Sequence, residues 1–306
     1  MKILITGVTG QLGYDVAREA TRRGHEVVGV GSANDAHCRT YFKCDITKEK
    51  EVQHLMKICK PDVVIHCAAY TDVDGAESNS DEAMRVNNYS TAYFATACNV
   101  YSSKMIYIST DYVFEDKFDT PMLPRQTTDK AYTSQEYGWS KLQGEGIIKS
   151  HLRNDSSKWM IVRTSWVFGI NGKKNFVKTM LNLAKTKNEI NVVFDQIGRP
   201  TYTVDLARLL IDMAESDKSG IYHATNEGDY ISWFEFAKKI YALSGKNQIT
   251  VKPVTTEDFG YIAKRPKNSM LDTSKLRESG FEPLPRWEDA LARYLIEIGE
   301  INEVRS

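Results

Sequence analysis

The sequence predicts a doubly wound α/β fold, in which one parallel sheet carries helices on both faces. Apolar runs of strand length alternate with helical patterns through the first half of the chain, beginning at Lys2-Ile3-Leu4-Ile5-Thr6. A glycine-rich turn follows this first run, and short polar or small-residue segments follow the later ones. Strands that alternate with helices pair in parallel, because each helix returns the chain across the sheet in a right-handed crossover.

Length and composition indicate a globular chain without a dominant charge. Its 306 residues suffice for one large core or two small ones, and 42% are hydrophobic. Lys+Arg and Asp+Glu both number 40, so we expect no nucleic acid and no membrane among its partners. The five cysteines lack a C-x-x-C pair and the histidines lack ligand spacing, which predicts no metal site. Without a signal-peptide or membrane-span pattern, the expected location is cytoplasmic.

The first strand leads into Gly7-Val8-Thr9-Gly10-Gln11-Leu12-Gly13, and a helical pattern continues from there to Arg23. Glycine allows the backbone to turn tightly and to approach a pyrophosphate closely. The free N–H groups at the helix start, near Gln11 and Leu12, would then face the anion. In this context the motif favours a nucleotide-binding Rossmann fold over a plain tight turn.

The second predicted strand, Glu26-Val27-Val28-Gly29-Val30, bears on the choice of cofactor. An acidic residue near its end would hold the ribose 2′-hydroxyl of NAD, yet the first acid here is Asp35. The missing carboxylate removes a repulsion against a 2′-phosphate, which His37 or Arg39 could help to bind. The pattern therefore indicates NADPH, with NADH as an alternative, and Ser32 is a candidate contact.

Two further strands end in residues that suit a nucleotide. Tyr41-Phe42-Lys43-Cys44-Asp45 predicts a third strand, and Asp45 could accept a hydrogen bond from an adenine amino group. It could also cap the helix that starts near Ile46, and the two roles can coexist. Asp62-Val63-Val64-Ile65-His66-Cys67-Ala68-Ala69 predicts a buried strand followed by small residues, against which a flat ring and a ribose can lie.

A helix over 80–101 precedes the fifth predicted strand, Met105-Ile106-Tyr107-Ile108-Ser109, which leads into Thr110-Asp111-Tyr112-Val113-Phe114. Ligands of open α/β sheets bind just beyond the carboxyl ends of the strands. Thr110 is therefore placed to offer its hydroxyl to a substrate oxygen. The alternative is an ordinary threonine at a strand end.

Tyr137 and Lys141, in Tyr137-Gly138-Trp139-Ser140-Lys141, lie four residues apart and hence on one helix face. A phenol with a pKa of about 10 exchanges protons poorly at pH 7. An ammonium beside it would favour the phenolate and lower that pKa, which makes the pair a workable proton donor for a forming alkoxide. Alone, such a pattern is more often a half-buried tyrosine and an exposed lysine. The aligned Thr110 favours the catalytic interpretation.

Together these residues resemble the extended short-chain dehydrogenase/reductase family, and within it the dTDP-4-dehydrorhamnose reductases. The resemblance covers the chain from Met1 to about Ile298. The glycine motif and Y-x-x-x-K identify only the superfamily. Its narrower motifs here are Ala68-Ala69-Tyr70-Thr71-Asp72-Val73, Ser109-Thr110-Asp111-Tyr112-Val113-Phe114 and Arg265-Pro266-Lys267-Asn268-Ser269. The match also includes Arg163-Thr164-Ser165-Trp166-Val167 and Gly198-Arg199-Pro200-Thr201.

The resemblance implies hydride transfer from NADPH or NADH to the C4 keto group of a dTDP-linked 4-keto-6-deoxyhexose. Tyr137 would protonate the alkoxide, Thr110 would orient it, and Lys141 would hold the nicotinamide ribose. The cofactor-binding candidates are Gly7, Gly10, Gln11, Leu12, Gly13, Ser32, Asp45, Ile46, Ala68, Ala69, Tyr70, Thr71, Tyr137 and Lys141. The substrate-binding candidates are Val73, Thr110, Asp111, Tyr112, Trp166, Arg265 and Asn268.

One contrast with related enzymes, one departure and one alternative accompany the resemblance. Related sugar-nucleotide dehydratases carry Thr-Asp-Glu where this chain has Tyr112 in third place, and a tyrosine cannot act as a carboxylate base, so reduction is favoured. The family's Pro-x-Asn-Val-Tyr-Gly run lacks its proline in 132–137, so the approach to the catalytic helix is expected to differ. A non-catalytic protein that resembles the regulatory β-subunit of methionine adenosyltransferase stays open, although the intact Thr110, Tyr137 and Lys141 argue for an enzyme.

The second half predicts a smaller, mostly helical substrate domain, and a homodimer is possible. We expect a dinucleotide-binding domain over 1–165 with a return segment at about 189–222, and a substrate domain over 166–188 and 223–300. The patterns behind this division are helices over 175–187, 203–216 and 287–298, a helix capped by Ser232, and strands over 190–194 and 220–224.

Overall fold

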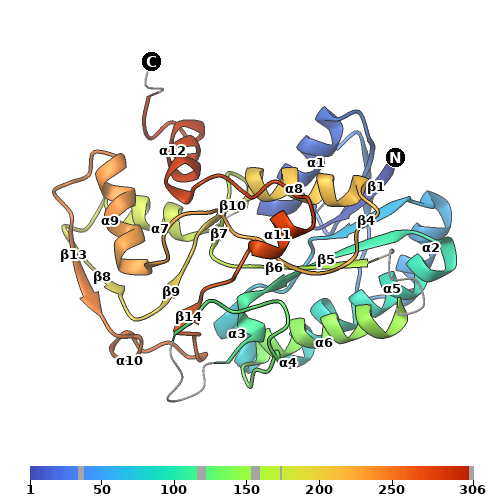
Figure 1. Ribbon diagram of the computed structural model, residues 1–306, viewed down its shortest axis with the longest axis horizontal. Coiled ribbons are helices and arrows are strands. Elements are labelled where there is room, and N and C mark those ends of the chain that lie inside the picture. The colour runs from blue at the N-terminus through green and yellow to red at the C-terminus, as the bar shows by residue number, and fades with distance from the viewer. Residues whose placement is uncertain (34–37, 116–121, 153–158, 173, 303–306) are drawn as a thin grey trace.

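The computed structural model describes residues 1–302 except 34–37, 116–121, 153–158 and 173 (Figure 1). Asp35 and His37, named in the cofactor prediction, lie outside the described residues. Seven parallel strands form the central sheet, in the spatial order β11 (Gly220–His223), β6 (Trp159–Thr164), β5 (Lys104–Thr110), β4 (Val63–His66), β1 (Lys2–Thr6), β2 (Glu26–Gly31) and β3 (Thr40–Lys43). The predicted fold class is confirmed.

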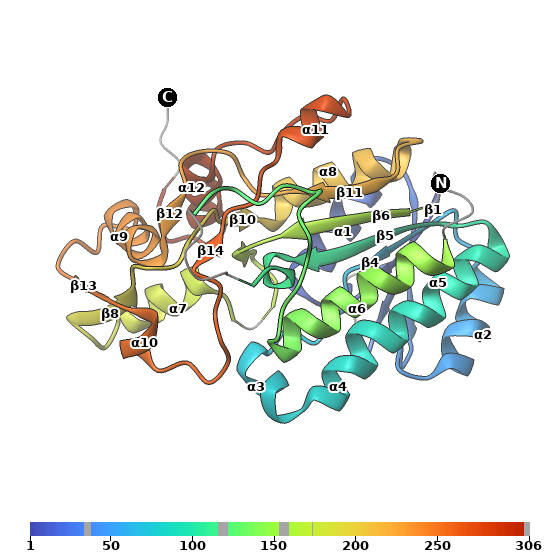
Figure 2. The same cartoon turned by 60° about the horizontal axis from the view of Figure 1, so that its bottom comes forward.

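Helices cover both faces of this sheet, as Figure 2 shows. One face carries α1 (Gln11–Arg22) and α8 (Thr203–Glu215), and the other carries α2 (Glu49–Cys59), α5 (Ser90–Tyr101) and α6 (Glu136–His151). Alternate residues of a strand point to opposite faces. Ile3 and Ile5 accordingly enter the core under α1 and α8, while Leu4 enters the core under α2 and α5. Burial on both sides explains the unbroken apolar runs.

The strand order places the ligand site. From β1 the chain builds the sheet through β2 and β3 to one edge, then returns to the other side of β1 with β4, β5 and β6. The order therefore reverses between β1 and β4, the kind of switch point beside which open α/β sheets bind ligands. The segments after β1, β4 and β5 hold several of the predicted site residues, including Gly10, Ala69 and Asp111.

The helix predicted over 80–101 contains an irregular turn. It divides into α4 (Ser80–Met84), a π-helical turn over Arg85–Tyr89, and α5. Short π segments widen a helix and often occur at functional sites. Asn87 in this turn holds both backbone groups of Tyr70: its Oδ1 accepts from the Tyr70 N–H at 2.9 Å, and its Nδ2 donates to the Tyr70 carbonyl at 3.1 Å.

The second half builds a smaller part with its own apolar core, formed largely by α7 (Phe176–Leu183), α9 (Trp233–Leu243) and α12 (Trp287–Glu297). These helices lie together at one end of the molecule (Figure 1). Three small sheets join the strands β7 (Val167–Phe168) with β10 (Thr201–Tyr202), β8 (Glu189–Val193) with β13 (Thr250–Val254), and β9 (Ile197–Gly198) with β12 (Ile231–Ser232) and β14 (Asn268–Ser269). The short helices are α3 (Val73–Ser78), a 3₁₀ turn over Asp111–Val113, α10 (Thr256–Phe259) and α11 (Ser274–Glu278).

The first part of the return segment predicted at about 189–222 lies outside the central sheet. Strands β8, β9 and β10 pair outside the central sheet, and the chain rejoins the central layers at α8 and β11. The reason is that β8 pairs with β13, a strand far along the chain, and no local sequence pattern reveals this pairing. The domain division itself stays a prediction. None of the helices in the described part of the chain is long and apolar enough to cross a membrane.

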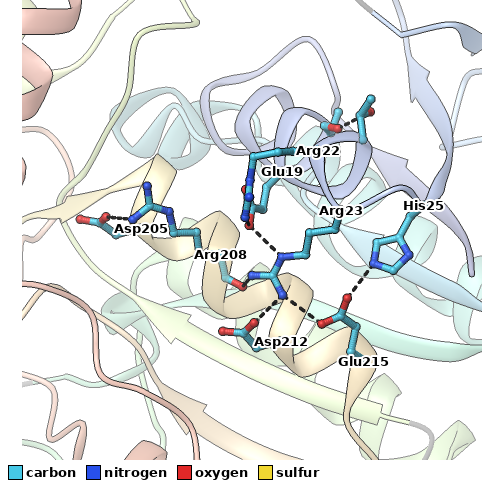
Figure 3. A network of polar contacts seen from close by, with 10 residues as sticks. Glu19, Arg22, Arg23, His25, Asp205, Arg208, Asp212 and Glu215 are labelled. Carbon is cyan, nitrogen blue, oxygen red and sulfur yellow. Dashed lines mark hydrogen bonds and ion pairs between the residues drawn. The ribbon is translucent and has the colours of Figure 1, made fainter.

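A network of charges ties α1 to α8 (Figure 3). Arg23 at the end of α1 donates to Glu19 at 2.8 Å and to Glu215 of α8 at 2.9 Å. His25 lies 2.8 Å from the second carboxylate oxygen of Glu215. These contacts join the C-terminal end of α1, the end away from the glycine loop, to α8.

Candidate active site

A cavity of about 1000 Å³ opens at the carboxyl ends of β1, β4 and β5. It brings together most of the predicted site residues, which come from segments far apart in the sequence. Those that line it are Gly7, Gly10, Gln11, Leu12, Gly13, Ser32, Asp45, Ile46, Ala68, Ala69, Thr71, Val73, Thr110, Asp111, Tyr112, Tyr137, Lys141 and Trp166. Tyr70, Arg265 and Asn268 are not among the lining residues.

The glycine loop has the close backbone packing that its sequence predicts. Gly7 has φ +65°, and a Cβ there would lie 2.8 Å from the backbone of Ala68. A Cβ on Gly13 would lie only 2.3 Å from the Gly7 carbonyl oxygen. No side chain caps the start of α1 at Gly10. The loop thus leaves a helix start open toward the cavity.

Gln11 connects the glycine loop to the smaller part of the chain. Its Oε1 accepts from the Gly169 N–H at 3.1 Å and from Asn175 Nδ2 at 2.9 Å. The same Asn175 amide caps α7 by accepting from the Lys178 N–H at 2.9 Å. The side chain of Gln11 is therefore engaged inside the protein, and its backbone remains the candidate for cofactor contact.

The start of α6 is packed tightly against the end of β5. Gln135 caps the helix by accepting from the Gly138 N–H at 2.6 Å. A Cβ on Gly138 would lie 2.2 Å from the carbonyl oxygen of Tyr112, so only glycine fits here. This contact brings Tyr137 near Thr110, whose hydroxyl acts to lower the pKa of the phenol. Thr110 also lies 3.1 Å from Asp111 Oδ1.

The prediction that Lys141 lowers the pKa of Tyr137 is wrong. Burial raises the pKa of Tyr137 to about 12, and the Thr110 hydroxyl only partly opposes this. Lys141 Nζ lies over the ring of Tyr107, 4.1 Å from its centroid, and burial lowers the pKa of Lys141 to about 7. Desolvation outweighs charge pairing at this depth. Tyr137 is thus held as a neutral phenol, which is the form that a proton donor needs.

Trp166 forms an aromatic wall at one side of the cavity. It stacks on Trp233 with ring centroids 3.7 Å apart, and its backbone is left-handed at φ +50°. A bulky residue adopts that conformation only where its surroundings enforce it. Trp233 in turn packs against Phe176, with ring centroids 4.4 Å apart.

Arg265 lies beside the cavity rather than in its lining. It donates to Asp74 at 2.7 Å and lies 3.4 Å from the Tyr112 hydroxyl. The Ala263 N–H donates to the other oxygen of Asp74 at 2.9 Å. Asp74 thereby fastens the 263–265 segment to α3.

Asn268 is buried within the protein. Its Nδ2 donates to the Leu123 carbonyl at 2.8 Å, and its Oδ1 accepts from the Met270 N–H at 3.0 Å. Its predicted contact with substrate, like that of Arg265, stays a prediction.

Several residues of the cavity were assigned no role from sequence. Lys43 ends β3 beside Gly31 of β2, at the end of the cavity where the 2′-position of a nucleotide is expected. Ser165 lines the wall next to Trp166, and its hydroxyl donates to the Arg199 carbonyl at 3.0 Å. For both Lys43 and Ser165, the sequence signal that could have indicated a place in the cavity was their position near the end of a predicted strand. Within the described ranges, no three His, Cys, Asp or Glu side chains gather as a metal site.

The comparison with protein families is decisive. The model of the RmlD substrate binding domain matches residues 1–299. The chain belongs to this family. That membership confirms the predicted resemblance, and the match spans both the central sheet and the smaller part.

Individual relatives align with this chain over nearly their full length. The chain is 38% identical over 296 residues to the spore coat polysaccharide biosynthesis protein SpsK of Bacillus subtilis, covering 97% of each. It is 39% identical over 303 residues to dTDP-4-dehydrorhamnose reductase of Aggregatibacter actinomycetemcomitans, covering 95% of this chain and 97% of the relative. The crystal structure of dTDP-4-dehydrorhamnose reductase from Bacillus anthracis in complex with NADP superposes with a TM-score of 0.87 at 39% identity. The superposition covers 97% of this chain and 99% of the chain in that structure.

Proposed function

We propose that this chain reduces the C4 keto group of dTDP-4-dehydro-L-rhamnose to give dTDP-L-rhamnose, with NADPH or NADH as hydride donor and Tyr137 as proton donor. The observation that carries the proposal is the meeting of Thr110, Tyr137 and Lys141 in one cavity with the glycine loop. Family membership bears out the coarser statement, an NAD(P)H-dependent oxidoreductase of sugar nucleotides.

The residues of the cavity fit a dinucleotide. Side chains at Gly7 and Gly13 would collide with neighbouring backbone, so the loop keeps the close approach that a pyrophosphate needs. Ala68 and Ala69 would lie against the nicotinamide ribose, whose hydroxyls Lys141 would hold. When bound, the nicotinamide supplies the hydride. Ser32 and Lys43, at the far end of the cavity, suit the ribose that distinguishes NADPH from NADH.

The protein's own groups manage the proton. Tyr137 stays protonated at pH 7 because burial raises its pKa to about 12. Thr110, which acts to lower the pKa of the phenol, would orient the substrate oxygen beside it. Once Tyr137 gives up its proton, the ammonium form of Lys141 would stabilise the phenolate that remains. Alignment of these groups would contribute much of the rate, because oriented groups react as if highly concentrated. All three come from one chain, and a homodimer stays a prediction.

The test is the loss of NADPH absorbance when dTDP-4-dehydro-L-rhamnose is added. We expect turnover that is lost when Thr110 or Tyr137 is replaced. Binding of NADP without oxidation by any of several nucleotide-linked 4-keto sugars would refute the proposal. That result would favour the non-catalytic regulatory alternative. Faster turnover with a GDP- or UDP-linked sugar would instead correct the nucleotide.

A further inference from the structure

A buried ion pair lies one helical turn beyond the catalytic lysine. Glu145 on α6 is 0% exposed, and Arg163 on β6 is 1% exposed. Arg163 donates from Nε to Oε1 at 2.8 Å and from Nη2 to Oε2 at 2.7 Å. The Ser109 hydroxyl donates to the same Oε1 at 2.7 Å. Removing two charges from water has a free-energy cost that pairing recovers only in part, and apolar residues could join α6 to β6 equally well. Stability alone therefore does not explain the pair.

The surroundings of Glu145 keep it ionised. Burial acts to raise the pKa of this carboxyl, but hydrogen bonds from Arg163 and Ser109 outweigh burial and leave the pKa below its ordinary value. Lys149 adds a further positive neighbour, with Nζ 3.6 Å from Oε2. On the far side of Arg163, His223 lies 3.3 Å away and is neutral at pH 7, because burial lowers its pKa to about 3.

Glu145 follows Lys141 by four residues on α6, so the two side chains are neighbours on one face of the helix. Burial lowers the pKa of Lys141 to about 7, and Glu145 is the strongest charge that opposes this loss. The other titratable groups around Lys141 contribute little positive or negative charge at pH 7. The Cys67 thiol has a pKa raised to about 12, His66 is neutral with a pKa of about 3, and Tyr107 is a protonated phenol whose pKa burial raises.

We propose that Glu145 is a positioning residue that keeps Lys141 protonated during the reaction, with Arg163 and Ser109 holding Glu145 in its ionised form. The inference rests on the proposed function, in which Lys141 contacts the ribose and faces the phenolate of Tyr137. An ammonium group offers three donors and a positive charge, whereas a neutral amine has lost one donor and the charge. Activity should therefore fall as pH rises and Lys141 loses its proton.

Two variants separate charge from shape. Glu145→Gln keeps the size of the side chain and removes its charge, whereas Glu145→Asp keeps the charge and shortens the side chain. The pKa of Lys141 is read without turnover, by acetic anhydride labelling of the cofactor-free protein across pH with mass spectrometry of the Lys141 peptide. We expect Glu145→Gln to move this titration, and the high-pH limb of kcat/KM, to lower pH by about one unit. Glu145→Asp should leave both close to wild type.

A third variant controls for misfolding. Glu145→Gln leaves the buried Arg163 guanidinium without its carboxylate partner, which can destabilise the fold. The double variant Glu145→Gln/Arg163→Met removes both charges together. Glu145 carries the charge that raises the pKa of Lys141, so the double variant should also shift to lower pH. An unmoved Lys141 titration in both Gln variants would overturn the proposal, and so would an equal shift in Glu145→Asp. If the wild type fails to oxidise NADPH, the proposed function is refuted while the labelling still tests Glu145.

Discussion

Replacing Gly138 by alanine should damage catalysis through a shift of the helix that carries Tyr137. The new Cβ would lie 2.2 Å from the Tyr112 carbonyl oxygen, a backbone atom, whereas ordinary contact begins at 3.4 Å. The start of α6 must therefore move away from β5 before the alanine fits. Tyr137 precedes Gly138 and Thr110 lies two residues before Tyr112, so the displacement would change the distance between the Tyr137 and Thr110 hydroxyls that we propose as catalytic. A misplacement of about 1 Å can cost on the order of 100-fold in rate.

The matched control lies on the same helix. Gly146 is exposed, and a Cβ added there would meet no atom within 4 Å, so alanine enters open space. Gly146→Ala should raise the free energy of unfolding by up to about 1 kcal/mol, because alanine favours helix. Its kcat, measured by NADPH absorbance, should equal that of the wild type. If Gly138→Ala also kept kcat within about threefold of wild type, close packing of α6 on β5 would not set the catalytic geometry.

Three further outcomes are expected. Tyr137→Phe should lower kcat by roughly 10²- to 10⁴-fold while NADP binding by fluorescence titration stays almost normal; near-wild-type turnover would remove Tyr137 from the mechanism. Asp74→Asn should raise KM for the sugar nucleotide more than it lowers kcat, because Arg265 loses its carboxylate partner; unchanged kinetics would show that this contact does not shape the site. Hydrogen bonds from two arginines lower the pKa of Glu19 to about 2 from 4.5. Stability from this group is complete above about pH 4.5 and lost as pH falls toward 2. Melting temperatures of Glu19→Gln should fall less steeply across that range, and parallel curves would contradict the assignment.

The fold and much of the site could be predicted because they depend on local patterns. The strand that ends at Thr6 and the turn through Gly13 are adjacent in sequence, so their geometry follows from residue type. Parallel strands then bring Thr110 to the same edge of the sheet as that turn. Tyr137 and Lys141 both line the cavity from α6, on the single helix face that their four-residue spacing predicted.

Features that depend on distant partners could not be predicted. The pKa of Tyr137 is set by burial that comes from several segments, and four-residue spacing says nothing of it. Arg265 carries the motif expected of a ligand contact, but Asp74, 191 residues away, takes its guanidinium. Strand β8 pairs with β13, which follows only after α8 and α9, and neither strand alone reveals the choice.

The packing of α1 against α8 has a consequence for synthesis. Thr203, the first residue of α8, donates to the buried Asp15 of α1 from 188 residues away. The apolar side of α1, including Val16 and Ala20, belongs to the same core as Leu206 and Leu210. A ribosome adds about 5–20 residues per second, so this side of α1 waits on the order of 10–40 s for its cover. During that interval α1, which follows the glycine loop, is exposed to aggregation or to a chaperone.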